Sequence, residues 1–288
     1  MFRRRMGITL SNYPKYLAKG YGQGEGADYQ PLIHVQDFPS RGWRNREWGW
    51  KTGRQHDYVS TPELHYHYFL DWSQVVVDFR EQFPLAPETT LEIAKHSGIR
   101  HPFDRKSGEP VVMTTDFLII LPQHIGFTKQ ARTIKLSKDL LNKRTVEKLE
   151  LERRFWQALG VHWAIVTERE IDLAIVNGMK WAYKFLPVSS LAPLTEDDVR
   201  LIAITLTRLV DVNSGSLSNT ASACDKQLGL QRGQSLAIAR HLIASRQWLV
   251  DVTKPVHPLE KLELLGNSLL DSKRKKGMIH ARPRKRIA

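Results

Sequence analysis

The sequence of 288 residues contains a single cysteine, Cys224. One thiol can form neither an intrachain disulfide nor a cysteine-rich zinc site. This usage is typical of a reducing compartment, so we expect a cytoplasmic protein. Long hydrophobic runs are also lacking. The longest, over 111–121, includes threonine and aspartate and is too short to span a bilayer, so no membrane segment is expected.

Acidic residues are few compared with basic ones. There are 30 Asp and Glu against 43 Lys and Arg, which gives a net charge of +13 and a pI near 9.8. An excess of this size favours a nucleic-acid partner, because Lys and Arg neutralise phosphates whatever the base sequence. We expect a basic N-terminal arm and a basic tail that bind nucleic acid nonspecifically. The tail carries Lys273, Arg274, Lys275, Lys276, Arg282, Arg284, Lys285 and Arg286.

A second basic group lies between residues 41 and 54, where tryptophans alternate with cations: Arg41, Trp43, Arg44, Arg46, Trp48, Trp50, Lys51 and Arg54. Aromatic side chains beside cations are typical of DNA-contacting surfaces, although simple packing explains them equally well. The nearby His56, His65 and His67 match no zinc-site spacing, so we expect them on the surface or facing DNA.

Hydrophobic patterns in the first part of the chain predict a mixed sheet flanked by helices. Ser60 to Glu63 has the S-x-x-E spacing of a helix capping box, although the alternation over 64–68 leaves a strand open. Strands are expected over 75–80, 111–121 and 127–136, with a hairpin between the last two. A helix over 145–159 and a strand over 162–167 then predict a parallel crossover.

The pattern changes after residue 170. Helices are expected from Thr195 to about Val210, over 218–228 and over 234–245, and a strand over 247–252. The last three elements suggest a winged helix. We therefore expect an α/β domain over 1–170, a mostly helical winged-helix-like domain over 171–268, and the basic tail over 269–288.

Asp116 is the first candidate for chemistry, because it lies within an apolar strand on the same face as Leu118 and Ile120. A structural, hydrogen-bonded aspartate remains an equal alternative. Lys135, on the next strand of the hairpin, is within reach of Asp116, although an edge-strand lysine would have the same sequence.

Two glutamates complete the candidate set. Glu152 lies near the middle of the apolar arc of the helix over 145–159, where a carboxylate is costly unless it is paired or placed near a metal. A buried ion pair with an arginine is the structural alternative. Glu63 has an equally good explanation as part of the helix cap.

The order of these residues resembles the PD-(D/E)xK nuclease superfamily, with an acid on the leading helix, an aspartate on the second strand, and a lysine two positions beyond Thr133 on the third. The resemblance implies a restriction-endonuclease-like fold. It also implies carboxylates that hold Mg²⁺ (or Mn²⁺) and a lysine that orients water or stabilises the phosphorane charge.

Longer segments are similar to the TnsA family, the endonuclease subunits of heteromeric cut-and-paste transposases. The similarity extends over about residues 20–170, and its segments are KTGR at 51–54, PEL at 62–64, DFREQFPL at 78–85, MTTDFL at 113–118 and EKLELERRFW at 147–156. Beyond residue 170 it rests on position and on the winged-helix pattern.

This resemblance implies that Glu63, Asp116, Lys135 and Glu152 are catalytic in a bacterial enzyme that hydrolyses the 5′-end strand at each transposon end. A separate DDE-type transposase, TnsB, would cut and join the 3′ ends, and the AAA+ regulator TnsC would contact the C-terminal domain. Thr133 replaces the usual acid before the lysine, so we expect its backbone carbonyl to bind the metal, together with Glu63 and Asp116.

Two other functions remain open at this point. The chain would also suit a stand-alone restriction-like DNA endonuclease, or a non-catalytic winged-helix adaptor that binds DNA. The joint placement of the four candidate residues makes the adaptor the weakest of the three hypotheses.

Overall fold

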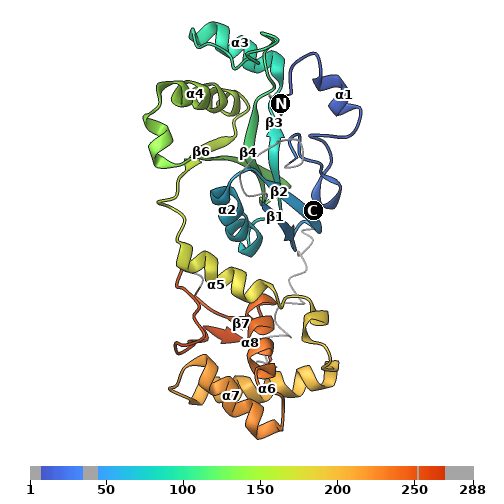
Figure 1. Ribbon diagram of the computed structural model, residues 1–288, viewed down its shortest axis with the longest axis vertical. Coiled ribbons are helices and arrows are strands. Elements are labelled where there is room, and N and C mark those ends of the chain that lie inside the picture. Colours follow the sequence, from blue (N-terminus) through green and yellow to red (C-terminus); the bar gives the residue numbers. More distant parts are fainter. Residues whose placement is uncertain (1–7, 35–44, 252, 270–288) are drawn as a thin grey trace, which may run out of the picture. The chain divides into compact units, whose positions relative to one another are not determined.

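The computed structural model describes residues 8–34, 45–251 and 253–269. The chain divides into two compact units, 1–172 and 173–288, and each is described by itself (Figure 1). Among the described residues, no helix combines the length and the apolar character needed to cross a membrane.

A four-stranded mixed sheet forms the centre of the first unit. Its strands lie in the order β3 (Asp78–Pro84), β4 (Thr114–Pro122), β5 (Phe127–Ile134) and β6 (His162–Val166). β3, β4 and β5 pair antiparallel, and β6 pairs parallel with β5. The expected hairpin and parallel crossover are therefore confirmed, since α4 (Lys143–Ala158) connects β5 to β6.

Helices cover both faces of this sheet. On one face α4 packs on the strands, and Leu151, Phe155 and Trp156 contact a core that includes Leu118 and Ile120. The neighbouring helix α3 (Pro87–Ser97) contributes to the same core. On the other face, a second core contains Phe117 and Ile119 of β4. It is covered by α2 (Thr61–Trp72) and by the hairpin of β1 (Asn45–Gly49) and β2 (Arg54–Tyr58) (Figure 1).

The N-cap at Ser60 decides between helix and strand over 61–72. Ser60 lies at the N-cap, its Oγ accepts a hydrogen bond from Glu63 N (3.3 Å), and a proline occupies the first turn. These signals fix the helix start, and the alternation over 64–68 reflects a helix with buried residues on several sides.

Several elements of the first unit differ from the sequence-based expectation. β3 begins at Asp78 and continues through Arg80, Glu81 and Gln82, because these polar side chains find partners inside the protein. The β1–β2 hairpin and α3 were not expected, and neither were α1 (Tyr13–Leu17) and the 3-10 helices η1 (Gly26–Asp28) and η3 (Ser137–Leu141).

The second unit is mostly helical. Its elements are α5 (Leu173–Tyr183), η4 (Val188–Leu191), α6 (Glu196–Val212), α7 (Leu217–Leu228), α8 (Gln234–Ala244), β7 (Trp248–Leu249) and β8 (Gly266–Asn267). The Thr195–Asp198 capping box starts α6, and Gly229 ends α7 in the left-handed conformation, in agreement with the expected helices from Thr195 and over 218–228. The expected last strand is reduced to the two residues of β7, paired with β8, and the winged-helix interpretation stays a prediction.

Candidate active site

Glu63 enters the site from the third position of α2. Ser60 Oγ donates to Glu63 Oε1 (2.7 Å) and the backbone N–H of Val59 donates to Glu63 Oε2 (3.3 Å). The side chain is buried, with 3% of the residue exposed. Burial, and next the charge of Asp116, raise the pKa of Glu63 to about 8. The residues just before α2 thus hold the Glu63 carboxylate, which is one of two acidic groups in the same site.

Asp116 lies on β4 and is the centre of the cluster. Its Oδ2 accepts hydrogen bonds from Ile134 N (2.7 Å) and from Lys135 Nζ (3.1 Å), and its Oδ1 accepts one from Gln82 Nε2 (3.3 Å). The structure therefore brings Asp116 and Lys135 together, as the hairpin register predicts. An isolated structural aspartate does not describe this arrangement, because a second carboxylate and a lysine are directed at the same place.

Lys135 follows the last residue of β5 and remains charged. Its Nζ also donates to the backbone carbonyl of Ile134 (2.9 Å). Burial opposes its positive charge, but the carboxylates of Asp116, Glu63 and Glu152 outweigh burial, so the pKa of Lys135 is raised. The group is an ammonium at neutral pH and carries the positive charge of the cluster.

Glu152 lies on α4 with its carboxylate turned toward the sheet. Its Oε1 accepts hydrogen bonds from the hydroxyls of Thr115 (2.7 Å) and Thr133 and from the indole of Trp163 (3.1 Å). Burial, and next the charge of Asp116, raise the pKa of Glu152 to about 7. The alternative of an arginine ion pair is wrong, since hydroxyls and an indole are the partners.

Thr133 directs its hydroxyl to Glu152 and also accepts a hydrogen bond from Trp163 Nε1 (3.2 Å). A hydroxyl that is engaged in this way does not turn toward Asp116. The N–H of Ile134 donates to Asp116 Oδ2, so the Thr133 carbonyl of the same trans peptide faces the opposite way, toward β6, and its expected contact with the metal is wrong. The carbonyl of Ile134, 2.9 Å from Lys135 Nζ, lies on the side of Asp116 instead.

The donor set of this site suits a hard divalent cation. Glu63 and Asp116 are two buried carboxylates whose mutual repulsion contributes to the raised pKa of Glu63, and oxygen ligands are what Mg²⁺ prefers. In the described part of the chain, no three His, Cys, Asp or Glu side chains are placed to hold a metal ion. A site made of two carboxylates and a backbone carbonyl agrees with both observations.

Gln82 is the residue of this site that the sequence analysis missed. Its amide lies between Glu63 and Asp116, with Nε2 3.4 Å from Glu63 Oε2 and 3.3 Å from Asp116 Oδ1. A neutral side chain within the DFREQFPL segment gives no charge signal. The only hint in the sequence is that this polar run follows an apolar strand start.

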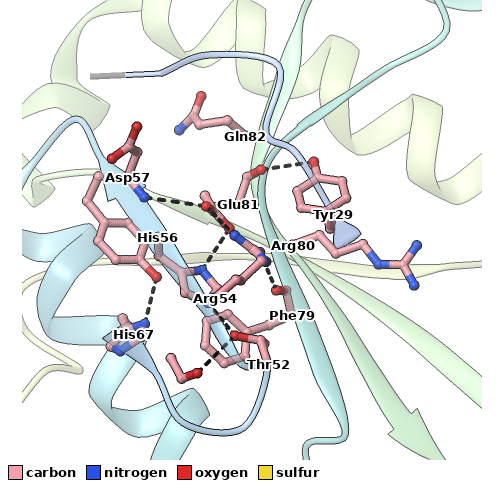
Figure 2. A network of polar contacts seen from close by, with 12 residues as sticks. Tyr29, Thr52, Arg54, His56, Asp57, His67, Phe79, Arg80, Glu81 and Gln82 are labelled. Carbon is pink, nitrogen blue, oxygen red and sulfur yellow. Dashed lines mark hydrogen bonds and ion pairs between the residues drawn. The ribbon is translucent and has the colours of Figure 1, made fainter. Parts of the chain in front are cut away.

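Arg54 does not belong to the DNA-binding group that the sequence predicts. Its guanidinium is buried and forms two hydrogen bonds with Glu81, Nη1 to Oε1 (2.8 Å) and Nη2 to Oε2 (2.6 Å), as Figure 2 shows. Arg54 also donates to the backbone carbonyls of Gly26 (3.1 Å) and Phe79 (3.1 Å). It therefore holds β3 in place, and its buried guanidinium is not presented to a phosphate.

Two of the three histidines are also not where the sequence suggests. His56 and His67 are fully buried, so the surface or DNA-facing placement is wrong for both. His56 Nδ1 is 2.8 Å from Glu81 Oε2, and His67 Nδ1 is 2.7 Å from the hydroxyl of Tyr58 (Figure 2). Arg54 and His56, acting against burial, hold the pKa of Glu81 well below its usual range.

The remaining cations of the expected DNA contact are only partly described. Arg46 forms an ion pair with Asp57 (3.0 Å) but keeps 37% of its side chain exposed, and Trp48 and Trp50 are exposed with ring centroids 6.2 Å apart. Arg41, Trp43, Arg44, the N-terminal arm and the tail cations lie outside the described residues. A DNA-contacting role for Arg46 and Lys51 stays a prediction.

Comparison with known proteins assigns the family. A model of the TnsA-like endonuclease N-terminal region matches residues 73–168, and a model of the TnsA endonuclease C-terminal region matches residues 170–252. The chain belongs to the TnsA endonuclease family. It is 37% identical over 229 residues to the transposon Tn7 transposition protein TnsA of Escherichia coli, which covers 80% of this chain and 81% of that protein.

Membership in this family makes the chain an endonuclease. It argues against a non-catalytic adaptor and against a purely structural role for the cluster of Glu63, Asp116, Lys135 and Glu152. Asp116, Lys135 and Glu152 lie inside the residues that match the N-terminal model, and Glu63 precedes them. Endonucleases of this type use a divalent metal, which agrees with the oxygen-rich donor set around Glu63 and Asp116.

Proposed function

We propose that this chain is the DNA endonuclease subunit of a cut-and-paste transposase and hydrolyses the 5′-end strand at the transposon ends with Mg²⁺ as cofactor. The convergence of Glu63, Asp116 and Lys135 in a TnsA-family chain carries this proposal. The named relative acts in Tn7 transposition, and work on bacterial DNA would place this protein in the cytoplasm.

Each residue has a defined part in the proposed reaction. Glu63, Asp116 and the backbone carbonyl of Ile134 would hold the cation, which would polarise the scissile phosphate and lower the pKa of an attacking water. Lys135, fixed by Asp116 at 3.1 Å, would orient that water or stabilise the charge that develops on the phosphate. Glu152 would position the Thr133 segment through its hydrogen bonds to the Thr115 and Thr133 hydroxyls.

Other parts of the chain would bind DNA and protein partners. Arg46, Lys51 and the exposed Trp48 and Trp50 would contact transposon-end DNA, and the basic tail would add nonspecific affinity. We infer that a DDE-type transposase, TnsB, cuts and joins the 3′ ends, and that residues 171–268 contact an AAA+ regulator, TnsC.

Strand-resolved mapping of donor DNA ends tests the proposal. The reaction contains Mg²⁺, the neighbouring DDE transposase and its regulator, and it compares wild type with Asp116→Ala. Glu92→Ala, which removes an exposed carboxylate on α3, serves as the matched control. We expect Asp116→Ala to keep the 3′-end cut and lose the 5′-strand cut by at least about 100-fold. A variant that still cuts both strands at the wild-type rate would overturn the assignment.

A further inference from the structure

Gln82 occupies a position in which its amide contacts both acidic groups of the site. Nε2 lies 3.4 Å from Glu63 Oε2 and 3.3 Å from Asp116 Oδ1, and Oε1 accepts a hydrogen bond from the hydroxyl of Thr114 (3.1 Å). The Thr114 contact agrees with this orientation of the amide. The reverse orientation would direct the amide oxygen at two carboxylates. Each proton of the NH₂ group is thus available to one carboxylate.

The backbone at Gln82 is unusual for a strand. Its φ is +46°, in the left-handed region that favours glycine, although it lies inside β3. The ladder pairs Glu81 with Phe117 and Phe83 with Thr115 but has no pair between them, where Gln82 is opposite Asp116. Strain of this kind persists where the surroundings enforce it and is concentrated at functional sites. A glycine would fit this backbone better, so the side chain itself is the reason for a glutamine here.

The surroundings that enforce this backbone are visible in Figure 2. Glu81, directly before Gln82, accepts two hydrogen bonds from Arg54 and is 2.8 Å from His56 Nδ1, and its backbone carbonyl accepts one from Tyr29 Oη (3.0 Å). The carbonyl of Gln82 itself accepts from the backbone N–H of Leu32 (3.3 Å). While Glu81 is held on this side, Gln82 projects away from the cluster (Figure 2) and reaches the acidic pair.

We propose that Gln82 is a positioning residue that holds the Glu63 and Asp116 carboxylates together in the arrangement a divalent cation requires. Its NH₂ group offsets part of their repulsion before the cation binds, so the site is formed in advance. Outer residues that orient metal ligands commonly change metal affinity by about 10- to 100-fold when they are replaced. This inference rests on the proposed function, because it concerns the same carboxylates.

Calcium titration of the full chain by calorimetry tests this inference without relying on DNA cleavage. Gln82→Met keeps the length of the side chain and removes the NH₂ group, and we expect it to weaken Ca²⁺ binding about tenfold or more. Gln55→Met, on the exposed side of β2, is the matched control and should bind like wild type.

A second variant separates positioning from folding. Gln82→Gly relieves the left-handed backbone but lacks the amide, so it should remain folded, as urea unfolding would show, and still bind Ca²⁺ weakly. The inference is overturned if folded Gln82→Met and Gln82→Gly bind Ca²⁺ like wild type. If wild type itself binds no Ca²⁺, the proposed metal-dependent function fails first, and the two failures are thereby distinguished.

Discussion

The free-energy cost of burying individual charged side chains explains most features of the site. A carboxylate without a cation is costly in a protein interior, and two that converge are costlier because they repel each other. The chain reduces this cost at Glu63 with hydrogen bonds from Ser60 and Val59, and at Asp116 with the ammonium of Lys135. The raised pKa of Glu63 shows that these contacts do not remove the cost completely. Such a pair is stabilised by a divalent cation.

The raised pKa of Glu63 leads to a pH dependence of stability. The unfolded chain loses the proton near the usual value of 4.5, whereas the native protein keeps it up to about pH 8. The unfolding free energy therefore falls with rising pH across this interval. From pH 7 to 9, without divalent cations, wild type should lose about 1.4 kcal/mol more than Glu63→Gln in urea unfolding. Equal losses in the two proteins would contradict a proton held on Glu63.

Magnesium provides the matched test of the same residue. Cation binding requires ionised ligands, so saturating Mg²⁺ should remove the extra pH dependence of wild type and leave Glu63→Gln nearly unaffected. The measurement is the same urea unfolding series with and without Mg²⁺.

Arg54 is expected to be essential for stability and irrelevant for DNA contact. Removing one partner of a buried ion pair is costly, and here it would leave Glu81 with His56 but without the guanidinium. Arg54→Met should therefore lower the unfolding free energy by about 3–5 kcal/mol. Arg105→Met, at an exposed position, should change it by less than about 0.5 kcal/mol. A folded Arg54→Met protein of normal stability but weak DNA binding would reverse this assignment.

The ends of the helices connect local structure with the site. Ser60 starts α2 and, through the same hydroxyl, holds the carboxylate of Glu63. Thr195 starts α6 in the other unit, where its side chain accepts from Asp198 N and the Asp198 carboxylate accepts from the Thr195 backbone N–H. The two caps can therefore be compared directly, because only Ser60 contacts a residue of the candidate site.

Replacing these two caps should have separable effects. Ser60→Ala and Thr195→Ala should each cost about 1 kcal/mol of unfolding free energy, because each removes the acceptor for an N–H group at a helix start. Only Ser60→Ala should also weaken Ca²⁺ binding, by about threefold to tenfold, since Glu63 loses a partner that orients it. Calorimetry on both variants checks this, and equal Ca²⁺ affinities would show that the cap does not position Glu63.

Elements were predictable where local signals and hydrophobic period agree. The β4–β5 hairpin, α4 and the caps of α2 and α6 follow from such signals, and they bring Asp116, Lys135 and Glu63 together as expected. The β1–β2 hairpin and the end of β3 did not follow, because their buried residues are polar. Arg54, His56 and Glu81 look like surface residues until their partners, which are distant in sequence, are known. Gln82 escaped notice for the same reason.

The whole molecule is strongly basic, and much of that charge is at its C-terminus. Residues 270–288 contribute eight basic residues and one acid, which is +7 of the total +13. Each phosphate contact adds about 0.9 to the slope of log affinity against log salt concentration. The basic residues of 270–288 should thus govern the affinity for DNA of any sequence, while Asp116 and its neighbours govern cleavage.

Truncation after residue 269 separates these two functions. The shortened chain should bind nonspecific duplex DNA more weakly at 100 mM salt, and the slope of its salt dependence should fall by about two units or more. Its Ca²⁺ affinity should equal that of the full chain. Titrations of labelled duplex at several salt concentrations measure the slope, and an unchanged slope would show that the tail makes no phosphate contacts.

The most direct test of the catalytic centre is the position of a bound cation. Crystals of the full chain soaked in Mn²⁺ would be measured at the manganese absorption edge, for wild type and for Asp116→Asn. We predict an anomalous peak in wild type between the carboxylates of Glu63 and Asp116, and a strongly reduced peak in the variant. A wild-type crystal with no peak there, or a peak that Asp116→Asn leaves unchanged, would contradict a metal-dependent centre at these residues.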